Sequence, residues 1–554
     1  MLIAGGGPAG LTLAISLGQL GVRCEVVDAR PAPARVPRAA RCGSRAMEIF
    51  RRMGLSGLLR DAGLPGEAPL DAVICAGSLA RPLTRHHYPS VAEVLATTLE
   101  VNDGTMPLEP AVILSQYTLE PMLREVAEAT PGVTVRFGAE LIDFTVTGDG
   151  VTAVVVTSTR LRTIRADYLV GCDGAGSTVR RTLGVELRGE KRPSLRQALI
   201  YCPDLYERLP GGRAIHYYVT GRHPCTLVVQ DDAQHFTLQT PMPGPPVAAL
   251  FEATAGAVCQ PLSYKVLYED EWAQHLLLAD RYTDCPEGRP EGSRVFLAGD
   301  AAHPASTLGG LGLSTSVGDA ADLAWKLAGT LAGWGGPALL ASYEAERRPV
   351  AAQAIAASFS PAVAEEPWAV DLRDAELGYR YTGSPVISQA GGTAPTGFAC
   401  TTWPGARLPH LWLEDGNPLH DVLGDGFTLL RMQAVGASAM ADPATSSEFG
   451  RELAAEFGRL GAPLDLVDVT SLASQAVYAG HRLILVRPDL HVAWRSGDSQ
   501  PTPAELAALV TGNGVTGNAV PGDAVTGNTG TGNTGTGNTG TGNTGTGNTG
   551  SENA

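Results

Sequence analysis

The loop Gly5-Gly6-Gly7-Pro8-Ala9-Gly10 decides the fold of this chain. Apolar residues 2–4 precede the loop as a short strand, and a helical pattern of leucines follows it over residues 11–20. The first glycine permits a tight turn, the third lets the backbone approach a pyrophosphate, and the last lets the helix pack on the strand. We therefore predict a Rossmann-type unit in which the helix N-terminus faces phosphate.

An acidic residue after the second strand supports this prediction. Residues 24–27 form that strand, and Asp28 ends it 18 positions after Gly10, where a carboxylate would accept hydrogen bonds from ribose hydroxyls. A glycine-rich turn followed by an unrelated surface Asp is the alternative, and the order strand, loop, helix, strand and acid makes it the weaker one. These residues alone do not separate an NAD site from an FAD site.

Length and composition narrow the class of protein. With 554 residues, 44% hydrophobic and 18% charged, the chain is globular and long enough for two or three domains. Its net charge of -16 argues against nucleic-acid partners and anionic membrane surfaces. No apolar run is long enough to cross a bilayer and no signal peptide fits before the glycine loop, so we expect a cytoplasmic protein. The nine Cys include no CxxC pair and His86-His87 has no further ligands at useful spacing, so we expect reduced thiols and no metal.

The pattern of strands and helices predicts an α/β chain in several segments. A strand-rich stretch at 195–275 indicates a sheet inserted into the nucleotide-binding domain, and a long Ala-rich helix is expected over 316–332. The tail repeats Thr-Gly-Asn with almost no apolar side chains, so we predict disorder rather than a short-period β-solenoid. The predicted boundaries are 1–180 and 286–385 for the two parts of the nucleotide-binding domain, 181–285 for the inserted β-sheet domain, 395–505 for a third α/β domain and 511–554 for the tail.

Three further segments make the prediction specific. Gly299-Asp300-Ala301-Ala302-His303 follows a buried strand, Cys172-Asp173-Gly174 follows another strand, and Gln116-Tyr117-Thr118-Leu119-Glu120 opens a helix. Together they resemble the p-hydroxybenzoate hydroxylase class of FAD-dependent aromatic monooxygenases, in particular its phenol-hydroxylase-like group with polyketide-tailoring enzymes. The resemblance covers about residues 1–355, and the third domain resembles the thioredoxin-like C-terminal domain of that group, without its Cys pair.

The resemblance implies FAD as the bound cofactor and NADPH or NADH as the reductant. Asp300 would bond the ribityl chain, and Gln116 and Arg38 would contact the ribityl and phosphate region. Arg45 is assigned to the same region, with a solvated helix charge as the alternative; Asp173 would serve both cofactors or simply cap the next helix. The predicted cofactor-binding residues are Gly5, Gly7, Pro8, Ala9, Gly10, Asp28, Arg38, Arg45, Gln116, Asp173, Gly299, Asp300, Gly310, Gly312 and Leu313.

The implied reaction is hydroxylation of a phenolic or polycyclic aromatic substrate. NAD(P)H would reduce FAD, and O2 would form a flavin hydroperoxide that transfers one oxygen to an electron-rich ring carbon. The candidates for substrate contact and catalysis are His216, Tyr218 and Gln239 in the inserted sheet, with ordinary sheet packing as the alternative for each. Strand alternation places His216 and Tyr218 on one face and Tyr217 on the other. We expect a monomer or homodimer.

Two positions depart from the family pattern. Leu311 stands where the family usually has Gln, and Ser314 where it usually has Asn, beside the expected flavin ring and near a helix expected to begin around Ser316. The positive end of that helix would stabilise the reduced anionic flavin. The departures leave two alternatives open: a Baeyer–Villiger-type or ring-oxidising flavoenzyme of the same fold, and a flavin-binding pathway partner without turnover.

Overall fold

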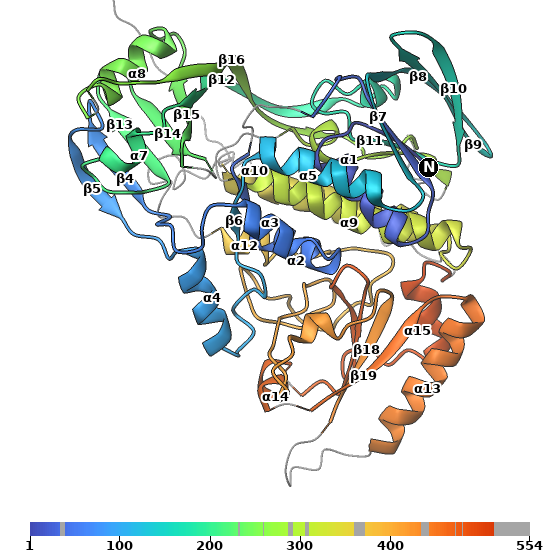
Figure 1. Ribbon diagram of the computed structural model, residues 1–554. Coiled ribbons are helices and arrows are strands. Elements are labelled where there is room, and N and C mark those ends of the chain that lie inside the picture. The colour runs from blue at the N-terminus through green and yellow to red at the C-terminus, as the bar shows by residue number, and fades with distance from the viewer. Residues whose placement is uncertain are drawn as a thin grey trace, which may run out of the picture. The chain divides into compact units, whose positions relative to one another are not determined.

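The computed structural model of the chain is shown in Figure 1. Arg38 and residues 515–554 of the predicted tail lie outside the residues that it describes. The described residues are 1–33, 39–230, 233–258, 260–285, 292–304, 310–358, 372–433, 443–470, 472–478 and 480–514.

A five-stranded parallel sheet forms the centre of the nucleotide-binding domain. Its strand order is β17-β11-β1-β2-β7, and β1 lies between β11 and β2 in parallel register. Both faces of a parallel sheet are covered, which is why β1, β11 and β17 are short apolar runs, whereas the edge strand β7 alternates. The strands are β1 (Leu2–Ala4), β2 (Cys24–Asp28), β7 (Val133–Phe137), β11 (Leu169–Gly171) and β17 (Val295–Leu297).

The helices against this sheet include the predicted glycine-loop helix. The chain has α1 at Pro8–Gln19, α5 at Gln116–Ala129 and α10 at Pro337–Ser358. The long helix expected over 316–332 is α9, and it spans Leu311–Leu331. The expected start near Ser316 is therefore wrong by more than one turn, because residues 311–315 are already helical. The positive end of α9 lies at Leu311 instead.

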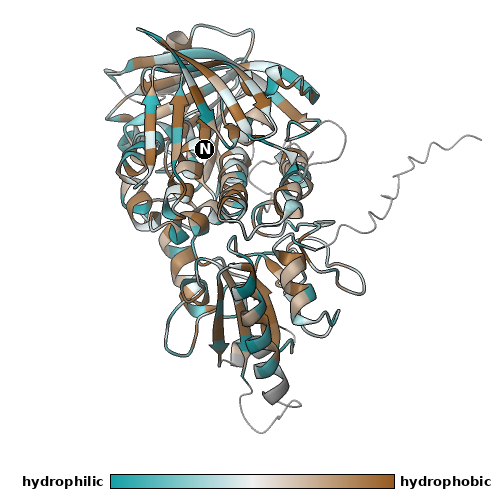
Figure 2. Cartoon of the chain, turned by 90° about the vertical axis from the view of Figure 1, so that its right-hand side faces the viewer, coloured by the Kyte–Doolittle hydropathy of each residue, from teal (hydrophilic) through white to brown (hydrophobic). Residues whose placement is uncertain are grey.

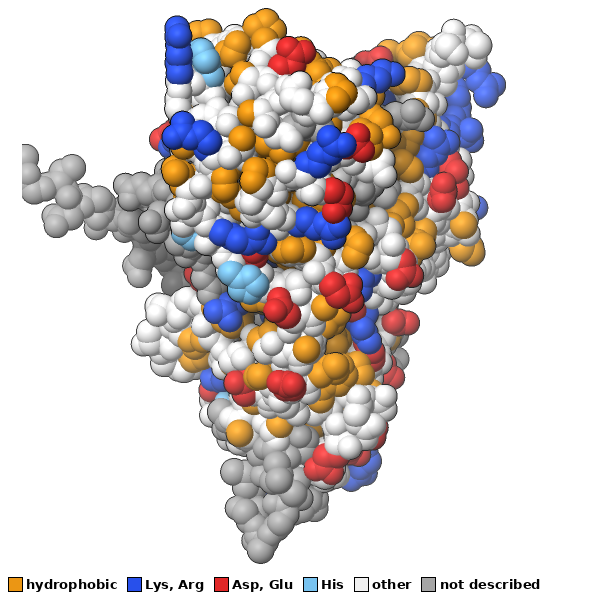
Figure 3. All heavy atoms as spheres, turned by 60° about the vertical axis from the view of Figure 1, so that its left-hand side comes forward, with side chains coloured by type: hydrophobic (Ala, Val, Ile, Leu, Met, Phe, Trp, Pro, Cys, Tyr) orange, Lys and Arg blue, Asp and Glu red, His pale blue; other side chains and the backbone are white. Residues whose placement is uncertain are grey.

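A seven-stranded sheet carries the predicted insertion. Its order is β16-β12-β15-β14-β13-β4-β5, and its two last strands come from residues 72–86, which the sequence pattern did not assign to it. One face is apolar and packs on α7 (Leu205–Arg208) and α8 (Val247–Ala255). Acidic and basic side chains are interspersed over the outside of this part of the molecule (Figure 3). The strands are β4 (Ala72–Ala76), β5 (Pro82–His86), β12 (Leu187–Tyr201), β13 (His216–Thr220), β14 (Cys225–Val229), β15 (His235–Pro241) and β16 (Lys265–Ala279).

Two long strands connect this sheet to the nucleotide-binding domain. β12 and β16 pair antiparallel from Leu187↔Ala279 to Tyr201↔Lys265. At the first of these ends Ala279 donates its N–H to Ala302, in the segment after β17, over 2.7 Å. The insertion therefore leaves and re-enters the first domain at adjacent points.

A small separate sheet of β8 (Ala139–Thr147), β9 (Gly150–Thr157) and β10 (Leu161–Ala166) shows the alternation of a half-buried sheet (Figure 2).

The remaining short elements surround these sheets. β3 (Arg41–Cys42) pairs with β6 (Val112–Ile113), and the helix pattern after it is split into α2 (Ser44–Arg52) and α3 (Ser56–Ala62). The split falls at Gly54, which has a φ of 76°. The other short helices are α4 (Val91–Glu100), α6 (Thr178–Thr182) and α12 (Arg373–Glu376).

The third domain has the expected thioredoxin-like topology. Its sheet order is β19-β18-β20-β21, with β18 parallel to β19 and antiparallel to β20. Brown, apolar strands lie beneath helices with polar faces in Figure 2. Thr511 follows the last helix and is buried. The elements are β18 (Phe427–Met432), α13 (Pro443–Leu460), β19 (Leu464–Val469), α14 (Leu472–Val477), β20 (Leu483–Val486), β21 (Val492–Arg495) and α15 (Pro503–Val510).

A buried ionic network joins the third domain to α9 and α10. Arg487, in the turn between β20 and β21, is 1% exposed and donates to Asp322 over 2.8 Å, to Glu346 over 2.7 Å and to Asp489 over 2.7 Å. Lys326 donates to Asp322 and Glu346 from the other side. The three carboxylates and two cations of this network are therefore all buried. Each charge needs the opposite charges beside it to offset its loss of hydration.

We predict that Arg487→Met strongly destabilises the protein. The substitution leaves buried carboxylates with too few cations, and breaking such a pair typically costs about 3–5 kcal/mol. Chemical unfolding of the purified variant measures this loss. Arg431→Met is the control, because the Arg431–Asp468 pair is partly exposed and pairs of this kind contribute about 1 kcal/mol or less. Equal losses in the two variants would contradict the prediction.

Two buried histidines lie where the third domain meets α2. His410 and His420 are each 3% exposed, and their ring centroids are 5.3 Å apart. Among the described residues, neither ring nitrogen of His410 has a hydrogen-bond partner. Burial lowers the pKa of His410 to about 4 and that of His420 well below its ordinary value, and nearby Arg407 lowers both further against the opposing effect of Glu48. Both imidazoles are therefore neutral in the folded protein at pH 7.

We predict that the free energy of unfolding falls as the pH drops from 6.5 toward 4. In this window the unfolded chain binds protons on these imidazoles and the folded chain does not, so acid favours unfolding. For His410 alone the loss between pH 7.5 and pH 5 is about 2 kcal/mol. Denaturant unfolding at a series of pH values measures the slope. The double variant His410→Gln, His420→Gln should have a flatter slope, and an unchanged slope would refute the assignment.

Candidate functional site

The glycine loop has the geometry that a bound pyrophosphate needs. Gly5 has a φ of +107°, and a Cβ on it would lie 2.1 Å from the carbonyl oxygen of Cys172. A Cβ on Gly10 would lie 2.0 Å from the Gly5 oxygen, so helix and strand are in direct backbone contact. No described atom would lie within 4 Å of a Cβ on Gly7, and no described side chain caps α1 there. The helix therefore directs free N–H groups and its positive end into open space, which fits the phosphates of a dinucleotide.

Asp28 is buried beside this loop and is held by more partners than the sequence indicated. Its carboxylate accepts from the Gly6 N–H over 2.7 Å and from two guanidinium nitrogens of Arg30 over 3.0 and 2.9 Å. Arg30 also donates to Glu120 over 3.2 Å, and Glu120 accepts from the Gln116 amide over 2.6 Å. Asp28 and Gln116 are thus connected through Arg30 and Glu120, two residues that no motif had assigned to the site.

Two of the predicted cofactor residues have other partners. Asp173 accepts from the backbone N–H groups of Thr178 and Val179 over 2.7 and 3.1 Å, which is the helix-capping alternative for this residue. Arg45 is 3% exposed, so its expected alternative as a solvated charge is wrong. Its guanidinium donates to the Asp489 carbonyl over 2.5 Å, which joins α2 to the third domain.

The Gly299–Asp300 turn follows β17 and is fixed from below by α9. Gly299 has a φ of +61° and donates its N–H to Asp319 over 3.0 Å. Asp319 also accepts from His303 and, over 2.9 Å, from Arg347 of α10. Asp300 itself is exposed in this turn, whereas Asp319 beneath it is buried. His303 is itself buried, so its contact with Asp319 is a structural one.

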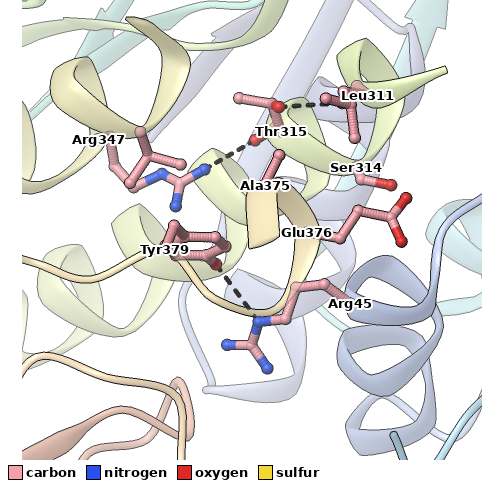
Figure 4. A pocket seen from close by; sticks show the side chains of 9 residues that line it. Arg45, Leu311, Ser314, Thr315, Arg347, Ala375, Glu376 and Tyr379 are labelled. Atoms are coloured by element: carbon pink, nitrogen blue, oxygen red, sulfur yellow. Dashed lines mark hydrogen bonds between the residues drawn. The ribbon is translucent and has the colours of Figure 1, made fainter. Parts of the chain in front are cut away.

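The first turn of α9 begins at a left-handed glycine. Gly310 has a φ of 65°, and no described atom would lie within 4 Å of a Cβ there, while Gly312 and Leu313 are half-buried in the first turn. Leu311 is 2% exposed and packs on Ala354 and Ala375. The residues in Figure 4 line a narrow pocket behind this turn: Arg45, Leu311, Ser314, Thr315, Arg347, Val350, Ala375, Glu376 and Tyr379.

The seven-stranded sheet presents a polar row on the face opposite α7 and α8. Register pairs Tyr218 with Thr226, Thr226 with Gln239, and Gln239 with Gln197 across four neighbouring strands. Directly opposed residues share a face, so these four side chains lie in one row. Gln239 donates its amide to Gln197 over 3.0 Å. The structure therefore brings two of the three catalytic candidates together, and adds Thr226 and Gln197, which the sequence pattern had not indicated.

The third candidate lies next to this row. The rings of His216 and Tyr218 are stacked with centroids 5.9 Å apart, and both are half-buried. Tyr217 points to the apolar face, where its hydroxyl donates to the Gly212 carbonyl over 2.7 Å. Burial lowers the pKa of His216 to about 4 and raises that of Tyr218 to about 12. At neutral pH the row thus offers a neutral imidazole as an acceptor and a phenol as a donor.

The sheet meets the nucleotide-binding domain at the start of α5. Ser115 donates its hydroxyl to Gln230 over 2.5 Å, and the Tyr117 and His235 rings have centroids 6.3 Å apart. Because Gln116 lies between Ser115 and Tyr117, one end of the sheet is fixed beside the predicted ribityl contact. The seven-stranded sheet is therefore attached to the nucleotide-binding domain directly beside Gln116.

Comparison with known proteins identifies the family. The FAD binding domain family matches residues 1–358, and the aromatic-ring hydroxylase C-terminal domain family matches residues 401–512. The chain belongs to the FAD-dependent aromatic-ring hydroxylases. It is an FAD-dependent monooxygenase by this membership, and the resemblance drawn from its motifs is confirmed.

Named relatives of this hydroxylase act on polycyclic compounds. The tetracenomycin B2 monooxygenase-dioxygenase of Streptomyces olivaceus is 32% identical over 91% of this chain and 96% of the relative. The aklavinone 12-hydroxylase of Streptomyces purpurascens has the same identity over the same shares. A solved ternary complex of aklavinone-11 hydroxylase with FAD and aklavinone is 29% identical, with a TM-score of 0.77 over 92% of this chain and 98% of that one. Among the described residues of the hydroxylase, no helix is both long and apolar enough to cross a membrane.

We predict that Gly7→Ala and Gly10→Ala affect this hydroxylase differently. Gly7→Ala should fold with the stability of the wild-type apoprotein and bind FAD at least tenfold more weakly, because its Cβ enters only the space left for the cofactor. Gly10→Ala should destabilise the apoprotein by about 1–3 kcal/mol, because its Cβ overlaps the Gly5 oxygen. Apoprotein unfolding and FAD titration measure the two effects. A loss of apoprotein stability in Gly7→Ala would contradict the prediction, because it would mean that the added Cβ contacts the protein rather than the cofactor.

Proposed function

We propose that this chain uses NAD(P)H and O2 to hydroxylate a phenolic, polycyclic aromatic substrate of the polyketide type. The observation that carries the proposal is the polar row on the seven-stranded sheet, because the same sheet contacts the start of α5 at Ser115 and Tyr117. The compounds in the names of the relatives, tetracenomycin and aklavinone, are polycyclic and support this substrate class.

The row suits a ring that carries both a hydroxyl and a carbonyl group. Neutral His216 accepts a hydrogen bond from a phenolic hydroxyl, and protonated Tyr218 donates one to a carbonyl oxygen. Gln239 is held in place by Gln197 and keeps its own carbonyl oxygen for the substrate. Because the pKa of His216 is near 4, this residue orients the phenol and is a poor base for removing its proton.

The cofactor residues divide the remaining tasks. Bound FAD supplies hydride acceptance and oxygen activation. The free N–H groups after Gly7 hold the pyrophosphate, Asp28 accepts from the ribose, and exposed Asp300 bonds the ribityl chain. The α9 N-terminus at Leu311 directs positive charge to the ring end of this site. The described residues leave the choice between NADPH and NADH to experiment.

A Baeyer–Villiger-type oxygen insertion is the second candidate function. The observation that favours it is the apolar Leu311 at the first turn of α9, where the family usually has Gln. In the structure Leu311 faces Ala354 and Ala375, so the change removes polarity from the interior of the pocket in Figure 4.

The test is to purify the yellow holoprotein and follow NADPH and NADH oxidation with a panel of polycyclic phenols and quinones. The proposal expects substrate-stimulated oxidation and a product heavier by one oxygen, whose NMR spectrum has a new phenol and no ring-expanded lactone. A lactone would establish the second candidate. A flavin-containing protein that oxidises neither nucleotide, whatever aromatic is added, would overturn both and leave the non-turnover partner.

We predict that Tyr218→Phe lowers kcat/KM for the accepted substrate about tenfold or more, because one hydrogen bond to a buried carbonyl is lost. The flavin content should not change. Thr220→Ser is the matched control on the same strand, since Thr220 is exposed at its end. An unchanged kcat/KM in Tyr218→Phe would remove this residue from the substrate row.

A further inference from the structure

A buried ion pair lies at the first turn of α9, separate from the network around Asp319. Glu376 is 4% exposed at the end of α12, and its carboxylate accepts from both terminal guanidinium nitrogens of Arg41. The Arg41 side chain, in contrast, keeps 33% of its surface exposed. The Glu376 carboxylate therefore lines the pocket of Figure 4, and Arg41 on β3 is the more exposed partner of the pair.

Two contacts of the backbone around β3 place this strand next to the segments assigned to FAD. The carbonyl oxygen of Ala39 accepts from the Gln116 N–H over 2.8 Å, just before Arg41. Just after Arg41, Gly43 donates its N–H to the Ser314 hydroxyl over 3.2 Å. Arg41 thus stands between the start of α5 and the first turn of α9, the two segments assigned to the ribityl chain and the ring of FAD.

The first turn of α9 offers little polarity of its own. The Ser314 hydroxyl accepts from Gly43, and the Leu311 side chain is turned to Ala354 and Ala375. A Cβ on Gly43 would lie 2.2 Å from a Glu376 oxygen and 2.6 Å from the Ser314 oxygen, so Glu376 is packed tightly against β3. Both positions that depart from the family pattern therefore have inward-facing side chains here. Arg41 and Glu376 add charge at this turn, next to Arg45 and Arg347, which line the same pocket.

We propose that Arg41, oriented by Glu376, is the cationic group beside the ring of bound FAD and that this pair sets the reduction potential of the cofactor. The inference rests on FAD binding and is independent of the proposed substrate. A reduced, anionic flavin is stabilised by a nearby cation and destabilised by a nearby carboxylate. The exposed end of the pair is the cation, so its net effect on the ring favours reduction. Glu376 moderates that effect and fixes the guanidinium in place.

The test is the midpoint potential of the bound FAD, measured by dye-coupled anaerobic titration without substrate. Glu376→Gln removes the opposing negative charge and should raise the potential. Arg41→Gln removes the cation and should lower it. We expect each shift to correspond to at least a tenfold change in the two-electron reduction equilibrium, which is about 30 mV. The opposite signs are the signature, because a general loosening of the site would move both variants the same way.

A double variant protects the test against misfolding. Arg41→Gln alone leaves the buried Glu376 carboxylate unpaired, which is costly. The variant Arg41→Gln, Glu376→Gln removes both charges, and its potential should lie below that of the wild type and above that of Arg41→Gln. The order Glu376→Gln, wild type, double variant therefore tests the proposal even if the single Arg41 variant does not fold.

The matched control is the Arg124–Glu128 pair on α5, which is partly exposed and far along the helix from Gln116. Arg124→Gln and Glu128→Gln should leave the potential unchanged. Shifts of equal sign in the Arg41 and Glu376 variants, or no shift beyond that of these controls, would overturn the proposal. Because the titration contains no substrate, a failure of the proposed hydroxylation would leave this result intact.

Discussion

The carboxylate of Asp319 holds together the elements that form the flavin site. It accepts from the Gly299 N–H, from His303 and from Arg347, and it is fully buried in α9. Burial raises its pKa, but His303 and Arg347 outweigh that effect, and the net shift is downward. A buried anion of this kind is tolerated only with its partners in place. The turn after β17, the middle of α9 and the middle of α10 therefore hold one another in fixed positions.

The third domain extends the same principle outward. Arg487 compensates carboxylates of α9 and α10, while Arg407 donates to Glu48 of α2 over 2.6 Å. The domain has a thioredoxin-like sheet without the Cys pair that redox chemistry would need. Besides these buried charges, Trp325 of α9 and Leu339 of α10 pack in the apolar core of the third domain. Its role in the described part of the chain is to close the back of the flavin-binding domain.

The features that sequence predicted well are those that depend on neighbours in the chain. The roles of Gly5 and Gly10 follow from one turn and one helix, and the backbone geometry bears out their close approach. The start of α9 was placed too late because the prediction followed the Ala-rich run, whereas Leu311 ahead of that run already packs on Ala354 of α10 and Ala375 of α12. Local propensity is a weak guide where tertiary packing decides.

Partners that are distant in sequence were beyond the reach of the motifs. Arg45 was assigned either to the cofactor or to solvent, and its partner is a carbonyl more than four hundred residues away. Arg41 and Glu376 are likewise 335 positions apart, so only the fold brings the pair together. The same holds for β4 and β5, whose place in the sheet depends on pairing with β13.

The composite origin of the seven-stranded sheet limits how this enzyme could acquire a new substrate by recombination. Most strands of the sheet lie in one segment between Leu187 and Ala279. The two ends of this segment are paired neighbours, so recombination between relatives could exchange it as a single unit. However, β4 supplies the strand next to His216 and Tyr218, and it belongs to a different stretch of the gene. A chimera that moves one stretch alone would seat a foreign β13 against a native β4. A chimera that inherits an intact substrate sheet must therefore receive both gene segments, the one that encodes β4 and the one that encodes β12 to β16.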